Sequence, residues 1–330
     1  MTDVKELLKQ KAALVEPALR KYAVLGDKTI ERMVLHPIEA GGKRLRPAMT
    51  LLACEAVGGD PEKIIPAAAA VELLHTFTLV HDDIMDHDEE RRGRPTVHKI
   101  WGEEMGIMVG DVLYSSAFKA LVDVRRNEIP ESRVLDAVEA LTEANSELQE
   151  GQILDMLFEE RSIIREDEYM RMITKKTGVL IECSLRIGGI LGGADPRQLK
   201  ALCVFGENAG VAFQIQDDIL DLIADQKELG KPIGSDIRKG KKTLIIVHAL
   251  NNAKPAEKKK LLSVLGKKKA GKKEVDAVIA LLRKTGSIDY AKQRVKTLSE
   301  DGKNALDALP ENDAKRNLIA ISDYLMERRY

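Results

Sequence analysis

The sequence predicts an all-α protein that forms a single domain over residues 1–330. Ala, Leu, Ile, Glu and Lys dominate the composition and only 4% of residues are aromatic, which is typical of helical proteins. Apolar residues recur at helical spacing in one segment after another, and no strand pattern exceeds a few residues. With 44% hydrophobic residues the chain can build one large core, and no linker or internal repeat divides it.

Two helices are expected at the start of the chain. An amphipathic helix is predicted over residues 3–22, with Asp3 and Glu6 as its capping pair. A shorter helix is expected to end at Leu35, because Pro37 disfavours the helical conformation of the residue before it, His36. The first of these helices is interpreted as a core or interface element.

A glycine-rich basic turn, residues 41–47, comes next and precedes a helix expected to start near Ala48. Its cations Lys43 and Arg46, together with the amide groups at the start of that helix, suit a phosphate group. Considered alone, the same turn is equally compatible with an ordinary basic surface loop.

The central feature is a long apolar helix that begins near Pro66 and ends in the acidic residues Asp82, Asp83 and Asp86. With about 100° of rotation per residue, Asp82 and Asp86 share one stripe and Asp83 lies beside them. Bare carboxylates at this spacing repel by roughly 1 kcal/mol in water and about 4 kcal/mol when half-buried, so the cluster favours a cation. Oxygen ligands indicate Mg²⁺ or another hard divalent ion. The alternative is a solvated acidic turn.

A loop over residues 88–96 is predicted after this cluster from its Gly and Pro. It carries Arg91 and Arg92, whose forked guanidinium groups would bind phosphate beside the metal ligands. The alternative is that these arginines only neutralise the neighbouring acids.

Further helices are expected over about 111–126, from Pro130 onward, and around 173–191. Lys176-Thr177-Gly178 interrupts the last of these, which makes Lys176 a candidate phosphate ligand. Lysines often interrupt helix stripes, so this signal is weak by itself.

A second acid cluster, Asp217, Asp218 and Asp221, repeats the spacing of the first at the end of another apolar helix. A turn at 194–196 precedes that helix. Two such clusters facing each other would hold several divalent ions around a polyanion, because Mg²⁺ completes its shell with water and substrate phosphate.

The basic, glycine-punctuated segment 229–243 is predicted to be a mobile flap. The lysine runs between residues 258 and 273 are interpreted as a solvated face, and no nucleic-acid partner is expected. The net charge of −1 likewise indicates neither nucleic acid nor an anionic membrane surface.

The cysteines and the termini indicate a cytoplasmic protein. Cys54, Cys183 and Cys203 are widely spaced in apolar surroundings, which suits free thiols in a reducing compartment. No apolar run approaches the roughly 18 residues of a membrane span, and no signal core is expected at the N-terminus.

Five motifs occur together in one order, and on them the sequence resembles the trans-prenyltransferases, also called polyprenyl synthases, from about residue 30 to 250. The motifs are Gly42-Lys43-x-x-Arg46, Asp82-Asp83-x-x-Asp86, Arg91-Arg92-Gly93-x-Pro95, Lys176-Thr177, and Gln214-x-x-Asp217-Asp218-x-x-Asp221 with the loop from Lys231 to Lys241. The resemblance implies a bundle of about a dozen helices around a deep apolar cavity, and a homodimer. It also implies addition of isopentenyl diphosphate to an allylic diphosphate (dimethylallyl, geranyl or farnesyl), with release of pyrophosphate.

The resemblance also implies roles for individual residues. Asp82, Asp86 and Asp217, with a contribution from Asp221, would hold several Mg²⁺ ions, for which Mn²⁺ is an alternative. The residues implied to engage the allylic diphosphate are Arg91, Lys176, Thr177, Gln214, Lys231 and Lys241. Those implied to hold isopentenyl diphosphate are Lys43, Arg46, His75 and Arg92. The reaction itself would depend most directly on Asp82, Asp86, Asp217, Arg91 and Lys176.

The residues below Asp82 on the central helix would measure the product. Phe77 lies five positions before the first motif and Thr78, four positions before it, is not aromatic, a pattern that resembles archaeal-type geranylgeranyl diphosphate synthases. A C20 product is therefore expected, with C15 or C25 next. The alternative for Phe77 is simple core packing.

Two other functions use similar residues. A terpene cyclase or a diphosphohydrolase also carries acid clusters, but cyclases typically lack the paired cations Lys43/Arg46 and Arg91/Arg92 because they bind one diphosphate. An inactive regulatory subunit would be expected to have lost one acid cluster, whereas both are intact here.

Overall fold

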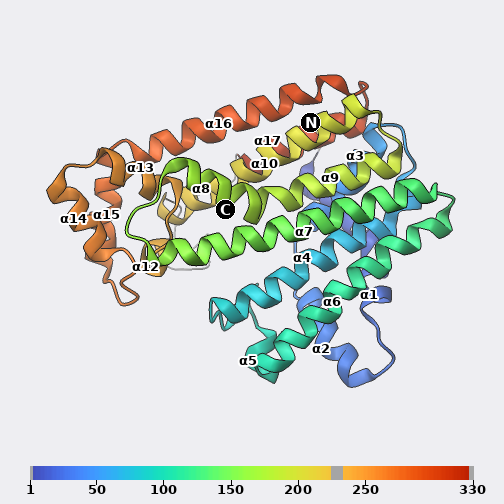
Figure 1. Ribbon diagram of the computed structural model, residues 1–330, viewed down its shortest axis with the longest axis horizontal. Coiled ribbons are helices and arrows are strands. Elements are labelled where there is room, and N and C mark those ends of the chain that lie inside the picture. Colours follow the sequence, from blue (N-terminus) through green and yellow to red (C-terminus); the bar gives the residue numbers. More distant parts are fainter. Residues whose placement is uncertain (1–2, 224–232, 327–330) are drawn as a thin grey trace. The chain divides into compact units, whose positions relative to one another are not determined.

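The computed structural model describes residues 3–223 and 233–326 and confirms the all-α class (Figure 1). Among these residues the only strands are β1 (Glu90–Arg91) and β2 (Arg94–Pro95). The chain divides into two compact units. Unit 1 comprises Met1–Asn145, Leu180–Cys203 and Leu306–Ala320, and unit 2 comprises Ser146–Val179, Val204–Ala305 and Ile321–Tyr330. The single domain over residues 1–330 stays a prediction.

The helices of unit 1 are α1 (Val4–Ala23), α2 (Lys28–Glu39), α3 (Leu45–Ala56), α4 (Ile65–Met85), α5 (Val97–Trp101), α6 (Glu103–Asp123) and most of α9 (Val179–Gly192). Those of unit 2 are α8 (Glu166–Ile173), the π-helical segment Thr174–Gly178, α12 (Ser235–Lys239), α13 (Leu244–Asn252), α14 (Pro255–Val264), α15 (Lys272–Lys284) and α16 (Ser287–Ala305). Besides α9, whose first residue Val179 belongs to unit 2, three helices contribute residues to both units: α7 (Glu131–Glu160), α10 (Pro196–Ile223) and α17 (Asp313–Met326).

Some helix boundaries match the sequence prediction and others do not. Asp3 caps α1 as expected, because its side chain accepts hydrogen bonds from the backbone N–H groups of Lys5 and Glu6. The predicted end of α2 at Leu35 is wrong, since the helix continues through Pro37. A proline in the last turn removes one backbone bond but leaves the next, from Ala40 N to His36 O at 3.2 Å.

Three further boundaries differ from expectation. α3 starts at Leu45 and not near Ala48, and α6 starts at Glu103, well before residue 111. Residues 88–96 are not an open loop, because β1 and β2 pair within them as a small antiparallel hairpin. Helix starts are the least reliable part of a sequence prediction, since weak local signals compete with packing.

The central helix α4 lies beside α6 in unit 1 (Figure 1). Small residues allow the two helices to approach closely. A Cβ atom at Gly106 of α6 would lie 2.8 Å from Ile84 Cδ1, and one at Gly110 would lie 2.2 Å from His81 Nε2. The glycines of α6 therefore make room for the side chains that flank the acidic end of α4.

Two segments are long and apolar enough to cross a membrane, Pro61–Met85 and Glu103–Asn127, contrary to the expectation that no run approaches that length. The most apolar window of the first is 67% buried inside the structure, and that of the second is 44% buried. Core helices meet the same criterion of length and composition, so these segments are weak evidence for a membrane span.

The core of unit 2 surrounds α13, whose residues from Leu244 to Leu250 are buried except His248. α13 packs against α8, α15 and α16. Ile219 and Leu222, at the end of α10, belong to the same apolar cluster, as does Tyr169 of α8. The acidic end of α10 is thereby anchored in this core.

Candidate active site

In the first acid cluster the middle acid is more deeply buried than the two outer acids. Asp82 and Asp86 are half-buried, one helical turn apart, and the backbone N–H of Asp86 donates to Asp82 O at 2.8 Å. Asp83 is buried, and the Nε of Arg91 donates to its Oδ1 at 2.6 Å. Burial raises the pKa of Asp83 to about 6, against the lowering effect of Arg91. The pair Asp82 and Asp86 is therefore the candidate metal ligand set of unit 1.

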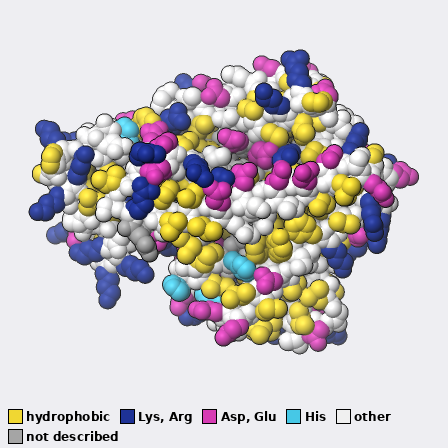
Figure 2. Space-filling model, viewed as in Figure 1, with side chains coloured by type: hydrophobic (Ala, Val, Ile, Leu, Met, Phe, Trp, Pro, Cys, Tyr) yellow, Lys and Arg dark blue, Asp and Glu magenta, His cyan; other side chains and the backbone are white. Residues whose placement is uncertain are grey.

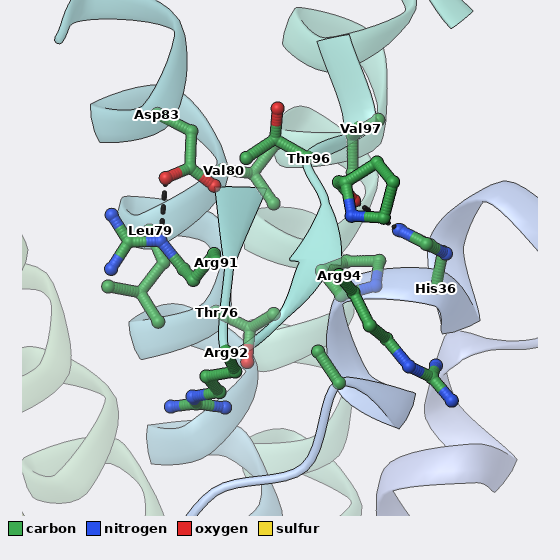
Figure 3. Close-up of a pocket in the computed structure, with 13 residues that line it drawn as sticks. His36, Thr76, Leu79, Val80, Asp83, Arg91, Arg92, Arg94, Thr96 and Val97 are labelled. Carbon is green, nitrogen blue, oxygen red and sulfur yellow. Dashed lines mark hydrogen bonds and ion pairs between the residues drawn. The ribbon is translucent and has the colours of Figure 1, made fainter. Parts of the chain in front are cut away.

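The hairpin β1–β2 positions both arginines (Figure 3). Its two-residue turn, Arg92-Gly93, has positive φ at both positions, 54° and 71°, as a tight right-twisted hairpin requires. Arg91 then reaches from the strand to α4, while Arg92 donates a hydrogen bond to the carbonyl of Gly41 in the basic turn. Arg91 therefore pairs with the middle acid of the cluster, and its role as a diphosphate ligand stays a prediction.

The basic turn and α4 bring Arg46 and His75 together. Arg46 Nη1 lies 3.1 Å from His75 Nε2. A guanidinium only donates, so this Nε2 accepts and the neutral ring carries its proton on Nδ1. Burial, with the charges of Arg46 and Arg92, lowers the pKa of His75 well below its usual value.

Arg46 has spare capacity to bind an anion. Burial lowers its pKa to about 10, so it stays cationic at neutral pH. Its Nε is buried and has no hydrogen-bond partner in the part of the chain that the structure describes. Arg92 approaches the same turn so closely that a Cβ at Gly42 would lie 2.7 Å from Arg92 Nη1. Two guanidinium groups and a neutral histidine therefore meet in unit 1, and Lys43 is exposed on the same turn.

Arg44, which the sequence did not single out, holds this turn in place. It is buried, has a left-handed backbone with φ of 46°, and donates to Glu72 Oε1 at 3.0 Å and to Glu16 Oε1 at 2.8 Å. Glu72 is the feature of the sequence that could have pointed to Arg44, since a buried acid in an alanine-rich helix needs a cationic partner.

In the second acid cluster the middle acid is again bound to the protein. Asp218 is buried and accepts hydrogen bonds from Tyr169 Oη and Gln214 Nε2, both at 3.0 Å. Burial raises the pKa of Asp218 well above its usual value. Asp221 is fully buried, and its Oδ2 accepts from the backbone N–H of Asp236 at 3.2 Å. Asp217 is half-buried.

The other candidate ligands of unit 2 lie around the π-helical segment Thr174–Gly178. Thr177 Oγ1 donates to Gln214 Oε1 at 3.4 Å. Lys176 and Lys241 both contact Asp155 of α7, which the sequence did not single out. Lys231 and residues 229–232 of the predicted flap lie outside the described residues, and the described remainder, 233–243, contains α12.

Phe77 faces α6 and contacts other aromatic rings. Its ring centroid lies 4.8 Å from that of His81 and 5.2 Å from that of Tyr114, whose own ring is 5.0 Å from Phe118. Thr78 donates to the carbonyl of His75 at 2.8 Å. Tyr114 and Phe118 were not identified from the sequence, although their spacing places them on one face of α6.

The described residues contain no group of three or more His, Cys, Asp or Glu side chains that could hold a metal ion. Mg²⁺ does not need one, because it is bound through one or two carboxylates and keeps the rest of its shell for water and phosphate. Asp82 with Asp86, and Asp217, therefore fit Mg²⁺ brought by a diphosphate.

Residues 27–282 match the family model described as polyprenyl synthetase. The geranylgeranyl diphosphate synthase of Methanosarcina mazei is 42% identical over 331 residues, covering 100% of this chain and 99% of that protein. The geranylfarnesyl diphosphate synthase of Aeropyrum pernix is 41% identical over 319 residues, covering 96% and 99%. The crystal structure of geranylgeranyl pyrophosphate synthetase from Pyrococcus horikoshii has a TM-score of 0.93 and 45% identity, covering 99% of this chain and 98% of that one.

Proposed function

The chain belongs to the polyprenyl synthetase family, and we propose that it is a short-chain prenyltransferase that joins isopentenyl diphosphate to an allylic diphosphate and releases pyrophosphate. We further propose that the product is geranylgeranyl diphosphate, with C15 or C25 as alternatives. The relatives support a short chain, and their names include both C20 and C25 products.

The observation that carries this proposal is the buried, unsatisfied Nε of Arg46 beside neutral His75. It lies in unit 1 together with Arg92. A transferase must bind two diphosphates, one with metal and one without. We assign isopentenyl diphosphate to Lys43, Arg46 and Arg92, whose charged donors suit a metal-free diphosphate, and to the neutral His75 beside them.

The allylic diphosphate is assigned to the carboxylates through Mg²⁺ and to the cations Arg91, Lys176 and Lys241. Bound Mg²⁺ supplies Lewis acidity that stabilises the leaving pyrophosphate. We assign the orientation of that group to the protein's own residues: Thr177, which follows Lys176 in the chain, donates to Gln214, and Lys231 is assigned here from its motif alone. Preorganised donors of this kind stabilise the charge that develops on the leaving oxygen.

An allylic cation must be protected from water until the second substrate attacks it. The ring of Phe77, 8% exposed and packed on Tyr114, supplies apolar surface one to two turns below Asp82. We propose that Phe77 and Thr78 also limit the length of the product.

The cyclase alternative fits the structure less well, because a protein that binds one diphosphate has no use for a second cationic site built around Arg46. The preformed pair of Arg46 and His75 therefore favours transfer over cyclisation.

We also propose a cytoplasmic homodimer. Cys54 and Cys183 are buried free thiols, as in a reducing compartment. Hydrophobic side chains gather on the surface over α6 (Figure 2), where Met105, Ile107 and Met108 are each more than 40% exposed. An apolar helix face of this kind suits a second copy of the chain.

The test is an incubation of purified protein with Mg²⁺, radiolabelled isopentenyl diphosphate and, separately, dimethylallyl, geranyl or farnesyl diphosphate, with products resolved by chain length. A dominant C20 band is expected. Arg46→Gln should raise KM for isopentenyl diphosphate by about 10- to 100-fold, as for a lost hydrogen bond to a charged group. The matched control, Arg20→Gln, changes an exposed arginine of the same unit and should leave KM unchanged. No elongation with any starter would refute the proposal.

A further inference from the structure

Lys176 lies in an unusual piece of backbone. The segment Thr174–Gly178 is π-helical and joins α8 to α9. A π turn inserts an extra residue into a helix, is rare, and occurs often at functional sites. The insertion changes the direction in which the side chains of Lys175 and Lys176 leave the helix, so their contacts show what the turn achieves.

A glycine of α7 supports this turn. A Cβ atom at Gly151 would lie 2.4 Å from the backbone N of Lys176 and 2.7 Å from the backbone carbon of Lys175. No side chain fits in that space. Gly151 sits inside a long helix, where glycine costs roughly 1 kcal/mol relative to alanine, so close contact between α7 and the turn explains its presence.

One turn further along α7, Asp155 receives both lysines. Asp155 is 8% exposed, and its Oδ2 lies 2.6 Å from Lys176 Nζ and 3.3 Å from Lys241 Nζ. Gly151 and Asp155 share one face of α7, since they are four residues apart. The Nζ of Lys241 is also 4.0 Å from Glu159.

We propose that Gly151 and Asp155 are positioning residues that hold the ammonium groups of Lys176 and Lys241 together for the diphosphate of the allylic substrate. This inference rests on the proposed function, in which those two lysines bind that diphosphate. Asp155 acts through the lysines and is not itself a catalytic residue.

The charges explain why a single shared acid suits this task. Two ammonium groups that contact the same oxygen atom repel each other, and Asp155 offsets that repulsion before the substrate arrives. Each ammonium has three N–H donors, and a single contact with Asp155 takes only one of them.

The plain alternative is that Asp155 forms an ordinary structural ion pair. The neighbouring pair supplies the control, because Lys175 of the same turn contacts Glu150 of the same helix at 2.8 Å, and the side chain of Glu150 is 43% exposed. If ion pairing between α7 and the turn were all that mattered, Glu150→Gln and Asp155→Asn would have similar effects.

The experiment compares wild type, Asp155→Asn and Glu150→Gln by steady-state kinetics. Asp155→Asn should raise KM for the allylic diphosphate by about 10- to 100-fold, as for misplaced substrate ligands, with KM for isopentenyl diphosphate nearly unchanged. Glu150→Gln should change neither. An unchanged allylic KM in Asp155→Asn, or an equal rise for both substrates, would overturn the inference.

A second measurement does not depend on turnover. Calorimetric titration with Mg²⁺ and inorganic pyrophosphate should show weaker binding for Asp155→Asn than for wild type or Glu150→Gln, and equal binding would contradict the inference. If wild type binds pyrophosphate but makes no prenyl product, the proposed function fails while this inference is still judged by the titration. If Asp155→Asn does not fold, Asp155→Glu replaces it, with a smaller rise in allylic KM expected and no rise counting against the inference.

Discussion

Arg91 Nε donates a hydrogen bond of 2.6 Å to Asp83 Oδ1, in the middle of the first acid cluster. The equivalent middle acid of the second cluster, Asp218, is bound by Tyr169 and Gln214. In both clusters the protein itself occupies the middle carboxylate. The half-buried outer acids Asp82, Asp86 and Asp217 are the candidates for binding metal, and substitutions at the middle and outer positions should behave differently.

The first prediction concerns Asp82 and Asp83. Asp82→Asn should lower kcat by about 10²- to 10³-fold, in the range seen when one electrostatic stabiliser of a transition state is removed. Asp83→Asn should lower it by less than about tenfold, because the amide oxygen can still accept from Arg91. Steady-state rates at saturating Mg²⁺ measure both. Equal losses for the two variants would mean that Asp83 also binds the metal.

The second prediction concerns the pH dependence of stability. Burial and nearby arginines lower the pKa of His75 well below its usual value of 6.5. Below pH 6.5 the unfolded chain binds a proton at this residue that the folded chain does not, so stability falls as the pH falls.

Replacing His75 with Gln should therefore make the loss of stability between pH 6.5 and 5.5 shallower, by up to about 1.4 kcal/mol per pH unit. Urea unfolding of the ligand-free protein at several pH values gives this slope. The slope is the readout, since the variant also changes absolute stability. Parallel curves for wild type and variant would disprove a neutral His75.

The third prediction concerns the packing of α3, the helix that carries Arg46, against α9. α3 packs against α9 backbone to backbone, and a Cβ at Gly188 would lie 2.1 Å from the carbonyl oxygen of Thr50. Gly188→Ala should destabilise the fold by about 1–3 kcal/mol, because a backbone carbonyl cannot move aside as a side chain can. Gly271→Ala is the control: its Cβ would meet nothing closer than 3.8 Å, so a change within about 0.5 kcal/mol is expected. Thermal unfolding compares them.

The fourth prediction concerns product length. Phe77→Ala removes the ring that packs on Tyr114 and should move the main product from C20 to C25 or longer. Thr78→Phe adds a ring on the next position of α4 and should move it toward C15. Chromatography of the dephosphorylated products gives both distributions. If neither variant shifts the product, Phe77 is only a core residue, as the alternative interpretation holds.

The fifth prediction concerns assembly. Met108 is 56% exposed on α6, so Met108→Glu places a charge on the proposed dimer face. Light scattering should give a dimer for wild type and a monomer for the variant. Ile163→Glu, at a similarly exposed position in unit 2, should leave the dimer intact. A wild-type monomer would rule the dimer out.

The class of fold and the chemical residues could be predicted from the sequence because they depend on local properties. Helical periodicity, the Pro66 start of α4 and the spacing of Asp82 and Asp86 all act within one or two turns of a helix. The cations that follow each acid cluster could be recognised for the same reason, as could the interruption at Lys176 that proves to be a π turn.

The tertiary structure decided which protein groups contact these residues. Tyr169 and Asp218, or Gly151 and Lys176, lie far apart in the sequence, and no local pattern links them. Whether a proline ends a helix also depended on its surroundings, as α2 shows at Pro37. Local spacing determines which side chains share a face of one helix, whereas packing between helices determines what that face meets. The sequence alone therefore identified the acids and the cations, and only the packing of α7 and α8 against their neighbours showed which acids bind lysine or tyrosine.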